Sequence, residues 1–301
     1  MKFGDTIITQ LLLAVGALSR ILTRHGRLRL GKMIGWALAT ISAKRRAITH
    51  DNVRRALPEA SPSLQKQVVA SSYANLGIVL AELLALPGVS REELVEQVSM
   101  PGFDKVIERH KMGLPTILLS AHYGNWEYLA VVAGILLQAP ISIVVHPQSN
   151  EAANAILNSY RTMHGNILLP MHNAARSLVK LLSGGGTAAF LVDQHGHPEK
   201  DPWISFLGTP TPTYEAPAAL ALKFNAPIFC TFAERLDDGR YVARFDEIDM
   251  SDLEYTNDGV LKLTRRHVRA LEEAINARPE LWSWQHRRWR SEPPAEQGSA
   301  S

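Results

Sequence analysis

Residues Ile117 to Leu129 read ILLSAHYGNWEYL, and this stretch decides the fold. Ile117 to Ser120 are apolar or small, which predicts a short buried strand. Asn125 precedes the apolar run WEYLAVVAGILL and is a favourable N-cap, so a helix is expected to begin there. His122 therefore leaves the carboxyl end of a strand, which is where open α/β sheets usually place their chemistry.

Working outward, apolar runs alternate with helical patterns from Gly113 onward, which predicts a mainly parallel sheet with helices on both faces. The last two runs are joined by Asp237, Asp238 and Gly239 and predict an antiparallel hairpin, so the sheet is expected to be mixed. The expected strands are ILLSA, ISIVVH, ILLP, TAAFLVDQ, IFCTFAERL and RYVARFDEI, and the expected helices are 125–138, 151–164, 173–182 and 214–225.

His122 and Glu127 are the candidate catalytic pair. An imidazole can take a proton from a hydroxyl near neutral pH, and a carboxylate on its other ring nitrogen fixes the tautomer and stabilises the imidazolium. No serine or cysteine nucleophile is needed if the hydroxyl belongs to the substrate. The alternatives are that Glu127 complements the helix dipole and that His122 is a hydrogen-bonded loop residue.

The first hundred residues are expected to be mostly helical. Residues 7–22 are apolar but interrupted by polar side chains, and their uninterrupted core of eight residues is far shorter than the roughly 20 that span a membrane. A helix that lies in the membrane interface, or one that packs on the core with a solvated basic face, explains the pattern. Further helices are expected at 31–42 and 64–86. We predict a membrane-associating region at 1–50, an α/β domain at 51–291 and a disordered tail at 292–301.

The net charge of +3 hides a basic block between Arg20 and Arg55, with ten Lys or Arg residues against the single acid Asp51. Such a block suits an anionic surface, either a membrane or a nucleic acid. Its residues are interleaved with apolar helix rather than with a nucleic-acid-reading motif, so a nucleic-acid partner is not expected. The single cysteine, Cys230, lies in an apolar run and is expected to be a buried structural thiol.

Other polar residues follow the predicted strands. Asp193 and Gln194 end the run TAAFLV, so they are expected above the same crevice as His122, although Asp193 could simply cap the following loop. Arg161 lies three residues after Asn158 and can share its helix face. The loop after Gln194 is long and rich in proline, and either forms a lid over an acyl chain or is irregular.

Three other chemistries find little support. His195 and His197 form an HxH pair without a third ligand in register, so no metal site is expected. Gly184 to Gly186 lie between a helix and a strand, unlike a phosphate-binding loop. No GxSxG motif occurs, which argues against a serine hydrolase of the α/β type.

HYGNWE resembles the H-x4-D/E motif of the glycerolipid acyltransferases and, in its HxGNWE form, the lipid A late acyltransferases, the lauroyl and myristoyl transferases of lipopolysaccharide synthesis. The resemblance covers about 45–290 and includes four further stretches in the same order. These are RRAITHDNVRRALPE, VDQ at 192–194, FLG at 206–208 and WSWQHRRWR at 282–290. After FLG the chain continues TPTPTYEAP, where that family usually has threonines and a glycine.

This resemblance implies an O-acyltransferase at the cytoplasmic face of a Gram-negative inner membrane. The implied donor is acyl carrier protein, with a CoA thioester as the other possibility, and the implied acceptor is a Kdo-bearing lipid A precursor. A lyso-phospholipid, a lyso-ornithine lipid and another glycolipid are alternative acceptors for the same chemistry, and a noncatalytic membrane-bound protein is the alternative class. No cofactor or metal is expected, because hydroxyl attack on a thioester needs none.

In this scheme His122 is the base and Glu127 orients it, while backbone amides at the Asn125 helix start stabilise the oxyanion. Arg161 is expected to bind the phosphorylated acceptor or steady the site, although a solvated helix arginine fits the sequence as well. The loop 203–207 is expected to help set acyl chain length. The tryptophans and arginines of WSWQHRRWR suit a membrane interface or an anionic sugar phosphate, or else a strand with alternate Trp packed inside. The expected substrate-binding residues are Asn125, Asn158, Arg161, Asp193 and Gln194.

Overall fold

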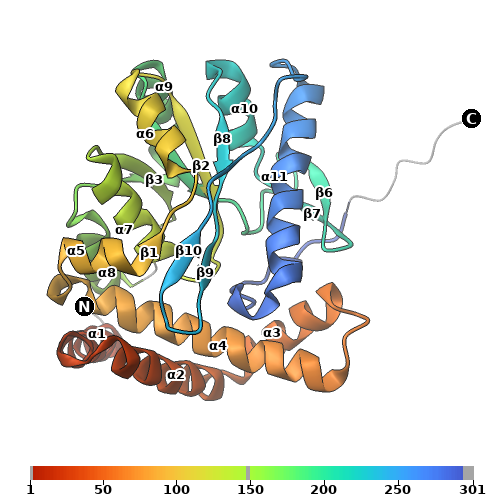
Figure 1. Ribbon diagram of the computed structural model, residues 1–301. Coiled ribbons are helices and arrows are strands. Elements are labelled where there is room, and N and C mark those ends of the chain that lie inside the picture. The colour runs from red at the N-terminus through yellow and green to blue at the C-terminus, as the bar shows by residue number, and fades with distance from the viewer. Residues whose placement is uncertain (1–2, 147–149, 294–301) are drawn as a thin grey trace, which may run out of the picture.

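The computed structural model describes residues 3–146 and 150–293. A central sheet is covered by helices on both faces and stands on a layer of N-terminal helices (Figure 1). The predicted fold class, an α/β protein with a mixed and mainly parallel sheet, is confirmed. Of the tail predicted at 292–301, residues 294–301 lie outside the described part.

The central sheet has six strands in the order β11-β8-β2-β5-β3-β4. All neighbours in it are parallel except β11 and β8, which are antiparallel. The strands are β2 (Thr116–Ser120), β3 (Ile141–Val145), β4 (Ile167–Pro170), β5 (Thr187–Leu191), β8 (Ile228–Cys230) and β11 (Asp246–Glu247). Because β2 lies in the middle, its carboxyl end brings His122 to the centre of one sheet edge.

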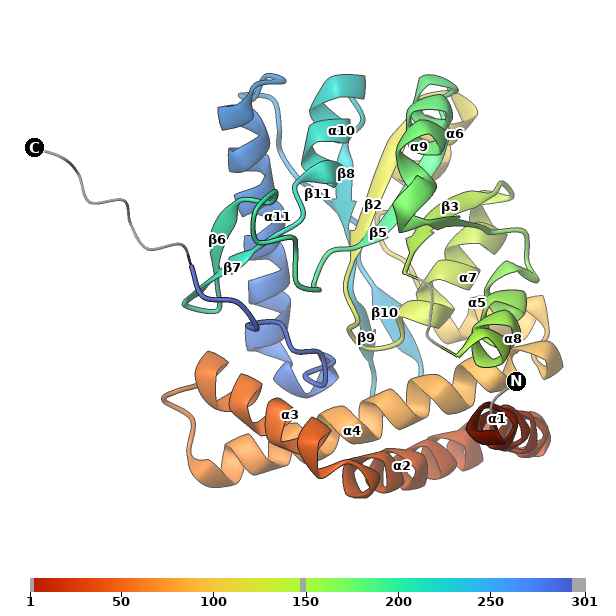
Figure 2. The same cartoon turned by 180° about the vertical axis from the view of Figure 1, so that it is seen from behind.

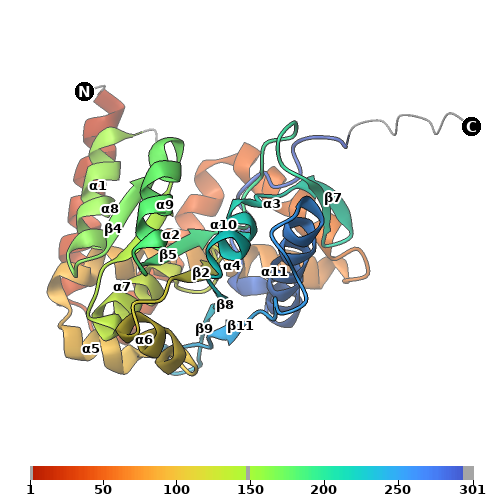
Figure 3. The same ribbon diagram turned by 90° about the horizontal axis from the view of Figure 1, so that it is seen from above.

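Alternate side chains of β2 enter different cores. Leu118 packs with one set of helices, and Ile117 and Leu119 pack with the other. The first set is α5 (Arg91–Gln97), α6 (Phe103–Lys111), α7 (Trp126–Leu137) and α8 (Glu151–Thr162); the second is α9 (Ala174–Ser183), α10 (Ala216–Phe224) and α11 (Asn257–Ala277) (Figure 3). Helices α6 and α11 were not among the elements expected from sequence, whereas α5 falls in the first hundred residues, which were expected to be mostly helical.

The hairpin predicted at the end of the sheet is divided between two sheets. β9 (Ala233–Arg235) and β10 (Tyr241–Ala243) pair antiparallel, but they form a small sheet with β1 (Val98–Ser99). The chain crosses to the central sheet at Phe245, whose ring packs on Phe103 and whose N–H donates to Pro101 O over 2.8 Å. The proline-rich loop contains a second hairpin, formed by β6 (Trp203–Phe206) and β7 (Thr209–Pro212).

The N-terminal layer consists of α1 (Phe3–Ile21), α2 (Arg24–Ile41), α3 (Ala43–Ala56) and α4 (Pro62–Ala85). Helices α2 and α4 cross closely because glycines face each other: a Cβ at Gly35 would overlap the backbone of Tyr73, and one at Gly77 would overlap Gly31 O. Two views show this layer beneath the carboxyl edge of the sheet, next to the start of α7 (Figures 1 and 2). The sheet edge that carries His122 therefore faces the N-terminal helices.

Within the described residues, one helical segment, 62–88, is long and apolar enough to cross a membrane, and 72% of its most apolar window is buried inside the protein. That burial is what a core helix shows, and α4 is the core helix of the layer. The predicted segment 7–22 falls largely in α1, which exposes several large apolar side chains, namely Ile7, Ile8, Leu11, Leu13 and Leu18.

Candidate active site

The turn between β2 and α7, residues 121–125, carries His122. Gly124 has a φ of +56°, and a Cβ there would overlap Ala233 O, so the turn requires glycine at this position. Asn125 caps α7 as predicted, its Oδ1 accepting from the N–H of Tyr128 over 2.9 Å. We call residues 121–125 the catalytic turn, after the role expected of His122.

His122 is held by Asp193 from the end of β5. The two Asp193 oxygens accept from the His122 ring and backbone: Nδ1 donates to Oδ1 over 2.9 Å and the backbone N–H to Oδ2 over 3.1 Å. Trp282 donates its indole N–H to the same Oδ2 over 2.9 Å. Because an ionised carboxylate only accepts, the ring proton lies on Nδ1, and Nε2 is left as the basic nitrogen.

The surroundings of this pair favour the charged forms of both Asp193 and His122. Burial opposes the charge on Asp193, but the attraction of His122 and three hydrogen bonds outweigh it and lower the pKa of Asp193 to about 2. Burial likewise lowers the pKa of His122, and the negative charges of Asp193 and Glu127 overcome this and raise it above 6.5. The His122 side chain is 26% exposed, so Nε2 belongs to an accessible base.

Glu127 lies beside this pair but does not hold His122 as expected. Its carboxylate is bound by Arg161, whose Nε donates to Oε2 over 2.9 Å and whose Nη2 donates to Oε1 over 2.6 Å. Trp126 Nε1 also donates to Oε1 over 3.1 Å. Glu127 sits in the first turn of α7 and is directed toward α8, whereas Asp193 ends the strand adjacent to β2. The hydrogen bond to Nδ1 that we expected from Glu127 is made by Asp193.

The other expected site residues divide into two groups. Arg161 Nη1 donates to Asn158 Oδ1 over 3.2 Å, so these two share a helix face as predicted, and Arg161 lines the cavity described below. Gln194 also lines the cavity, while its backbone O accepts from Arg288. Asn125 is fully buried and directs its amide N–H toward Glu82 over 2.7 Å, so its side chain is turned into the protein.

A cavity of about 350 Å³ begins at His122 and extends between α7 and the sheet. His122, Trp126, Glu127 and Arg161 form its polar part. The apolar part is lined by α7 and by β2, β3 and β5, and includes Leu118, Leu129, Ala133, Ile141, Ala189 and Phe245. Ala133, Ile141 and Phe245 are at most 3% exposed, so this end is closed by the core. The shape suits a flexible apolar chain with its reactive end at His122.

The loop 203–207 does not contribute to this cavity, contrary to expectation. Its residues form β6, and Phe206 packs on Trp282 and Trp289 at ring-centroid distances of 5.6 and 5.8 Å. The hairpin of β6 and β7 therefore covers the C-terminal tryptophans. The residues that we expected to set acyl chain length therefore lie in a hairpin against these tryptophans and not along the cavity.

The segment WSWQHRRWR is irregular and largely buried rather than a strand. Besides Trp282, which orients Asp193, Trp284 donates Nε1 to Pro279 O over 2.7 Å. Arg288 is 1% exposed and donates to the carbonyls of Gln194 and Pro212, so it fastens the end of β5 to the second hairpin. The role of Trp282 was not predicted from the sequence, although a buried indole N–H needs an acceptor and therefore carried a usable signal.

The histidine pair after Gln194 is engaged with other groups. His195 bonds to Arg288 O and Ser291 Oγ, whereas the backbone N–H of His197 donates to Asp201. Among the described residues no cluster of three His, Cys, Asp or Glu side chains could hold a metal. Cys230 is buried in the sheet, and burial raises the pKa of its thiol to about 12, so it is the structural thiol that we predicted.

Comparison with known proteins identifies the family of this chain. The model of the bacterial lipid A biosynthesis acyltransferase family matches residues 3–291, nearly the whole chain. A search of curated proteins finds no match. The match includes the catalytic turn, both carboxylates and the C-terminal tryptophans. The protein is an acyltransferase and belongs to the bacterial lipid A biosynthesis acyltransferase family.

Proposed function

We propose that this acyltransferase transfers a fatty acyl chain from acyl carrier protein to a hydroxyl of a Kdo-bearing lipid A precursor, at the cytoplasmic face of a Gram-negative inner membrane. The observation that carries the proposal is His122, oriented by Asp193 with Nε2 left basic, at the open end of an apolar cavity. A base beside a chain-sized cavity is the arrangement that thioester-to-hydroxyl transfer requires.

The proposed reaction is a proton-coupled attack. Nε2 of His122 removes the proton of the acceptor hydroxyl, and the oxygen attacks the thioester carbonyl carbon. When the tetrahedral intermediate collapses, the C–S bond breaks, and the leaving thiolate takes the proton from the imidazolium, which yields an ester and a free thiol. Asp193 stabilises the imidazolium and keeps the tautomer that the attack needs.

Two features can stabilise the developing negative charge. Helix α7 begins directly after the catalytic turn. The backbone amides of its first turn and the helix dipole favour an anion there. Arg161 lines the same cavity and forms an ion pair with Glu127. Glu127 is thus proposed to act by fixing Arg161, which reaches either the oxyanion or a phosphate of the acceptor.

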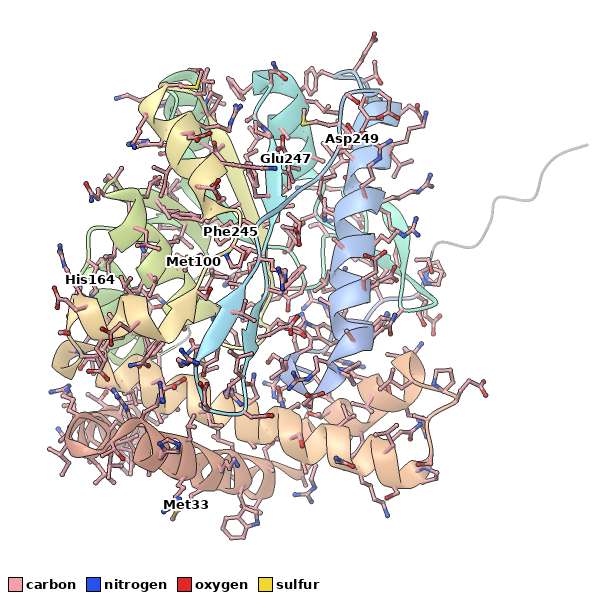
Figure 4. All side chains as sticks on the ribbon, in the orientation of Figure 1. Met33, Met100, His164, Phe245, Glu247 and Asp249 are labelled. Carbon is pink, nitrogen blue, oxygen red and sulfur yellow. The ribbon has the colours of Figure 1, made fainter. Side chains whose placement is uncertain are left out.

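The membrane side of the proposal rests on α1 and α2. Trp36 and Met33 are 72% and 67% exposed and lie three residues apart, hence on one face of α2. Figure 4 shows Met33 pointing away from the sheet on the outer side of the helical layer. Exposed Arg29 and Lys32 flank these side chains, a pattern that suits an anionic bilayer surface. The sheet edge with His122 faces this layer.

The rival acceptors are a lyso-phospholipid, a lyso-ornithine lipid and another glycolipid, with CoA thioester as the rival donor. The same site chemistry serves them all. Lipid analysis of a deletion strain separates them, because only a lipid A acceptor predicts the loss of one secondary acyl chain from lipid A.

The direct test is transfer of labelled acyl chain from acyl carrier protein to Kdo-lipid IVA by membranes that carry the wild type, His122→Ala or Asp193→Asn. We expect the first variant to lose at least about 100-fold, the size of a general-base contribution. His50→Ala, an exposed histidine on α3, is the matched control. Wild-type activity in His122→Ala would overturn the mechanism; transfer only to a lyso-lipid would overturn the acceptor.

A further inference from the structure

Two polar side chains of α4 are buried against the catalytic turn. Asn75 and Glu82 are seven residues apart, about two helical turns, so they lie on one face of α4. They are 2% and 1% exposed. No step of the proposed reaction uses either of them, although a buried carboxylate is costly unless its partners compensate it.

Asn75 binds the backbone of the catalytic turn and that of the C-terminal segment next to it. Its Nδ2 donates to Gly124 O over 3.2 Å and to Leu281 O over 3.0 Å. Its Oδ1 accepts from Arg235 Nη2. Leu281 immediately precedes Trp282, the residue that holds Asp193. Asn75 therefore joins the turn that carries His122 to the segment that orients its carboxylate partner.

Glu82 binds the side chain of Asn125. Its Oε2 accepts from Asn125 Nδ2 over 2.7 Å and from Tyr241 OH over 2.6 Å. Arg235 donates Nε to the same tyrosine oxygen over 3.1 Å. Burial raises the pKa of Glu82, and the positive charge of Arg235 opposes this shift. The Glu82 carboxylate thus has a nearby cation and two donors on one oxygen.

This contact decides which end of the Asn125 amide caps α7. A carboxylate accepts but does not donate, so Asn125 must direct its Nδ2 toward Glu82. Its Oδ1 is then directed to the N–H of Tyr128, which it accepts over 2.9 Å. The reversed amide would direct an N–H at another N–H and leave the helix uncapped.

We propose that Glu82 and Asn75 are positioning residues for the catalytic turn: Glu82 fixes the Asn125 side chain, Asn75 fixes the Gly124 carbonyl, and together they set His122 against Asp193. The inference rests on the proposed role of His122 as base. It assigns to α4, the core helix of the N-terminal layer, a part in the geometry of the site.

The test exchanges the two groups across the Glu82–Asn125 hydrogen bond. Asn125→Asp keeps the cap, because Asp and Asn are equally good N-caps, but it places two carboxylates face to face. Glu82→Gln alone keeps an oxygen for both donors. The double variant Asn125→Asp with Glu82→Gln restores a donor and an acceptor with the roles reversed. Asn75→Ala is a second variant that introduces no charge.

The measurements are kcat and KM for acyl transfer, together with the pKa of His122 followed by NMR of labelled histidine. We expect Asn125→Asp to lose roughly 10- to 100-fold in kcat, the scale of a misplaced catalytic group. KM for the donor should stay unchanged because Asn125 does not line the cavity. In Asn75→Ala, which adds no charge near His122, the pKa of His122 should fall as its contact with Asp193 loosens. Glu82→Gln should retain most of kcat, and the double variant should recover about tenfold over Asn125→Asp.

Each outcome decides the matter. A folded Asn125→Asp with wild-type kcat, or a double variant without recovery, would overturn the proposal. If Asn125→Asp fails to fold, Asn75→Ala carries the test through the same kcat and pKa readouts. If the wild type transfers no acyl chain, the proposed function fails, yet the pKa of His122 across the variants still tests the positioning role.

Discussion

Nδ1 of His122 lies 2.9 Å from Oδ1 of Asp193, a residue 71 positions further along the chain, while Glu127, five positions after His122, bonds to Arg161. Two carboxylates thus lie at one site and bind different partners. Asp193 holds the His122 imidazole in one tautomer, and Glu127 holds the Arg161 guanidinium beside it.

This division predicts a pH profile. Proton removal needs neutral His122, so kcat/KM should fall as the pH drops through the pKa of His122, which lies above 6.5. In Asp193→Asn the negative charge is lost and burial dominates, so the rising limb should move to lower pH while the maximal rate falls roughly 10²- to 10⁴-fold. Steady-state rates between pH 5 and 9 measure both. An unmoved limb in Asp193→Asn would contradict the assignment.

The same pair predicts two opposite dependences of stability on pH. The folded-state pKa of Asp193 is about 2, below its unfolded value of 3.8, so its contribution is present above 3.8 and is lost as pH falls toward 2. The folded-state pKa of His122 is raised, so its contribution is present below 6.5 and is lost as pH rises through the folded value. Urea unfolding of wild type and Asp193→Asn across pH 2 to 9 measures this, and parallel curves would contradict it.

The Glu127–Arg161 pair predicts an asymmetric mutational pattern. Side chains are only 6% and 20% exposed, so Arg161→Met leaves a buried carboxylate without its cation and should destabilise the protein by about 3 kcal/mol. Glu127→Gln with Arg161→Met removes both charges and should regain most of that loss, while activity stays low. Urea unfolding and acyl transfer on the same three proteins separate stability from function. If Arg161→Met and the double variant were equally stable, the loss in Arg161→Met would not come from an unpaired Glu127 carboxylate.

The cavity predicts how acyl chain length is chosen. Ala133 lines its closed end, so Ala133→Leu should shorten the space and shift the preferred donor toward shorter acyl chains. Competition between acyl carrier proteins loaded with chains of different length measures the shift. Ala221→Leu, a buried alanine of α10 outside the cavity lining, is the control for overpacking. A common loss of rate without a change in preference would refute the cavity's role.

How much the sequence could predict depends on distance along the chain. The strand before His122 and the cap at Asn125 are local patterns, and both were predicted. The partner of His122 was not, because Asp193 and Glu127 are both carboxylates at the same edge and the choice depends on how the turn and α8 place them. Trp282 was missed for the same reason, since its acceptor lies 89 residues away. Helix α11 was different: its buried Leu263, Leu271 and Ile275 follow helical spacing and carried a usable signal.

The glycine contact between α2 and α4 predicts a local steric effect. Gly35→Ala would place a Cβ on the backbone of Tyr73, so the helices must separate, and we expect a loss of about 1–3 kcal/mol. Gly16→Ala in α1 meets its nearest atoms at 3.4 Å, so it should be neutral or stabilising by up to about 1 kcal/mol through helix propensity. Thermal unfolding compares the two. Equal effects would mean that close packing is not what selects glycine at Gly35.

The proposed membrane contact of α2 predicts how vesicle binding depends on two exposed apolar side chains. Met33 and Trp36 are exposed, so replacing both with serine removes apolar area that no core contact needs, and folding should be unaffected. Binding to vesicles that contain anionic lipid should weaken roughly tenfold or more, since each apolar side chain contributes about 1.5–3 kcal/mol when fully buried. Thr40→Ser on the same helix is the control. Activity on a dispersed, detergent-solubilised acceptor should persist in the double variant while activity on vesicle-bound acceptor falls, because the base and the cavity are untouched. Equal losses in both assays would mean that this face acts on the site itself rather than on the approach to the bilayer.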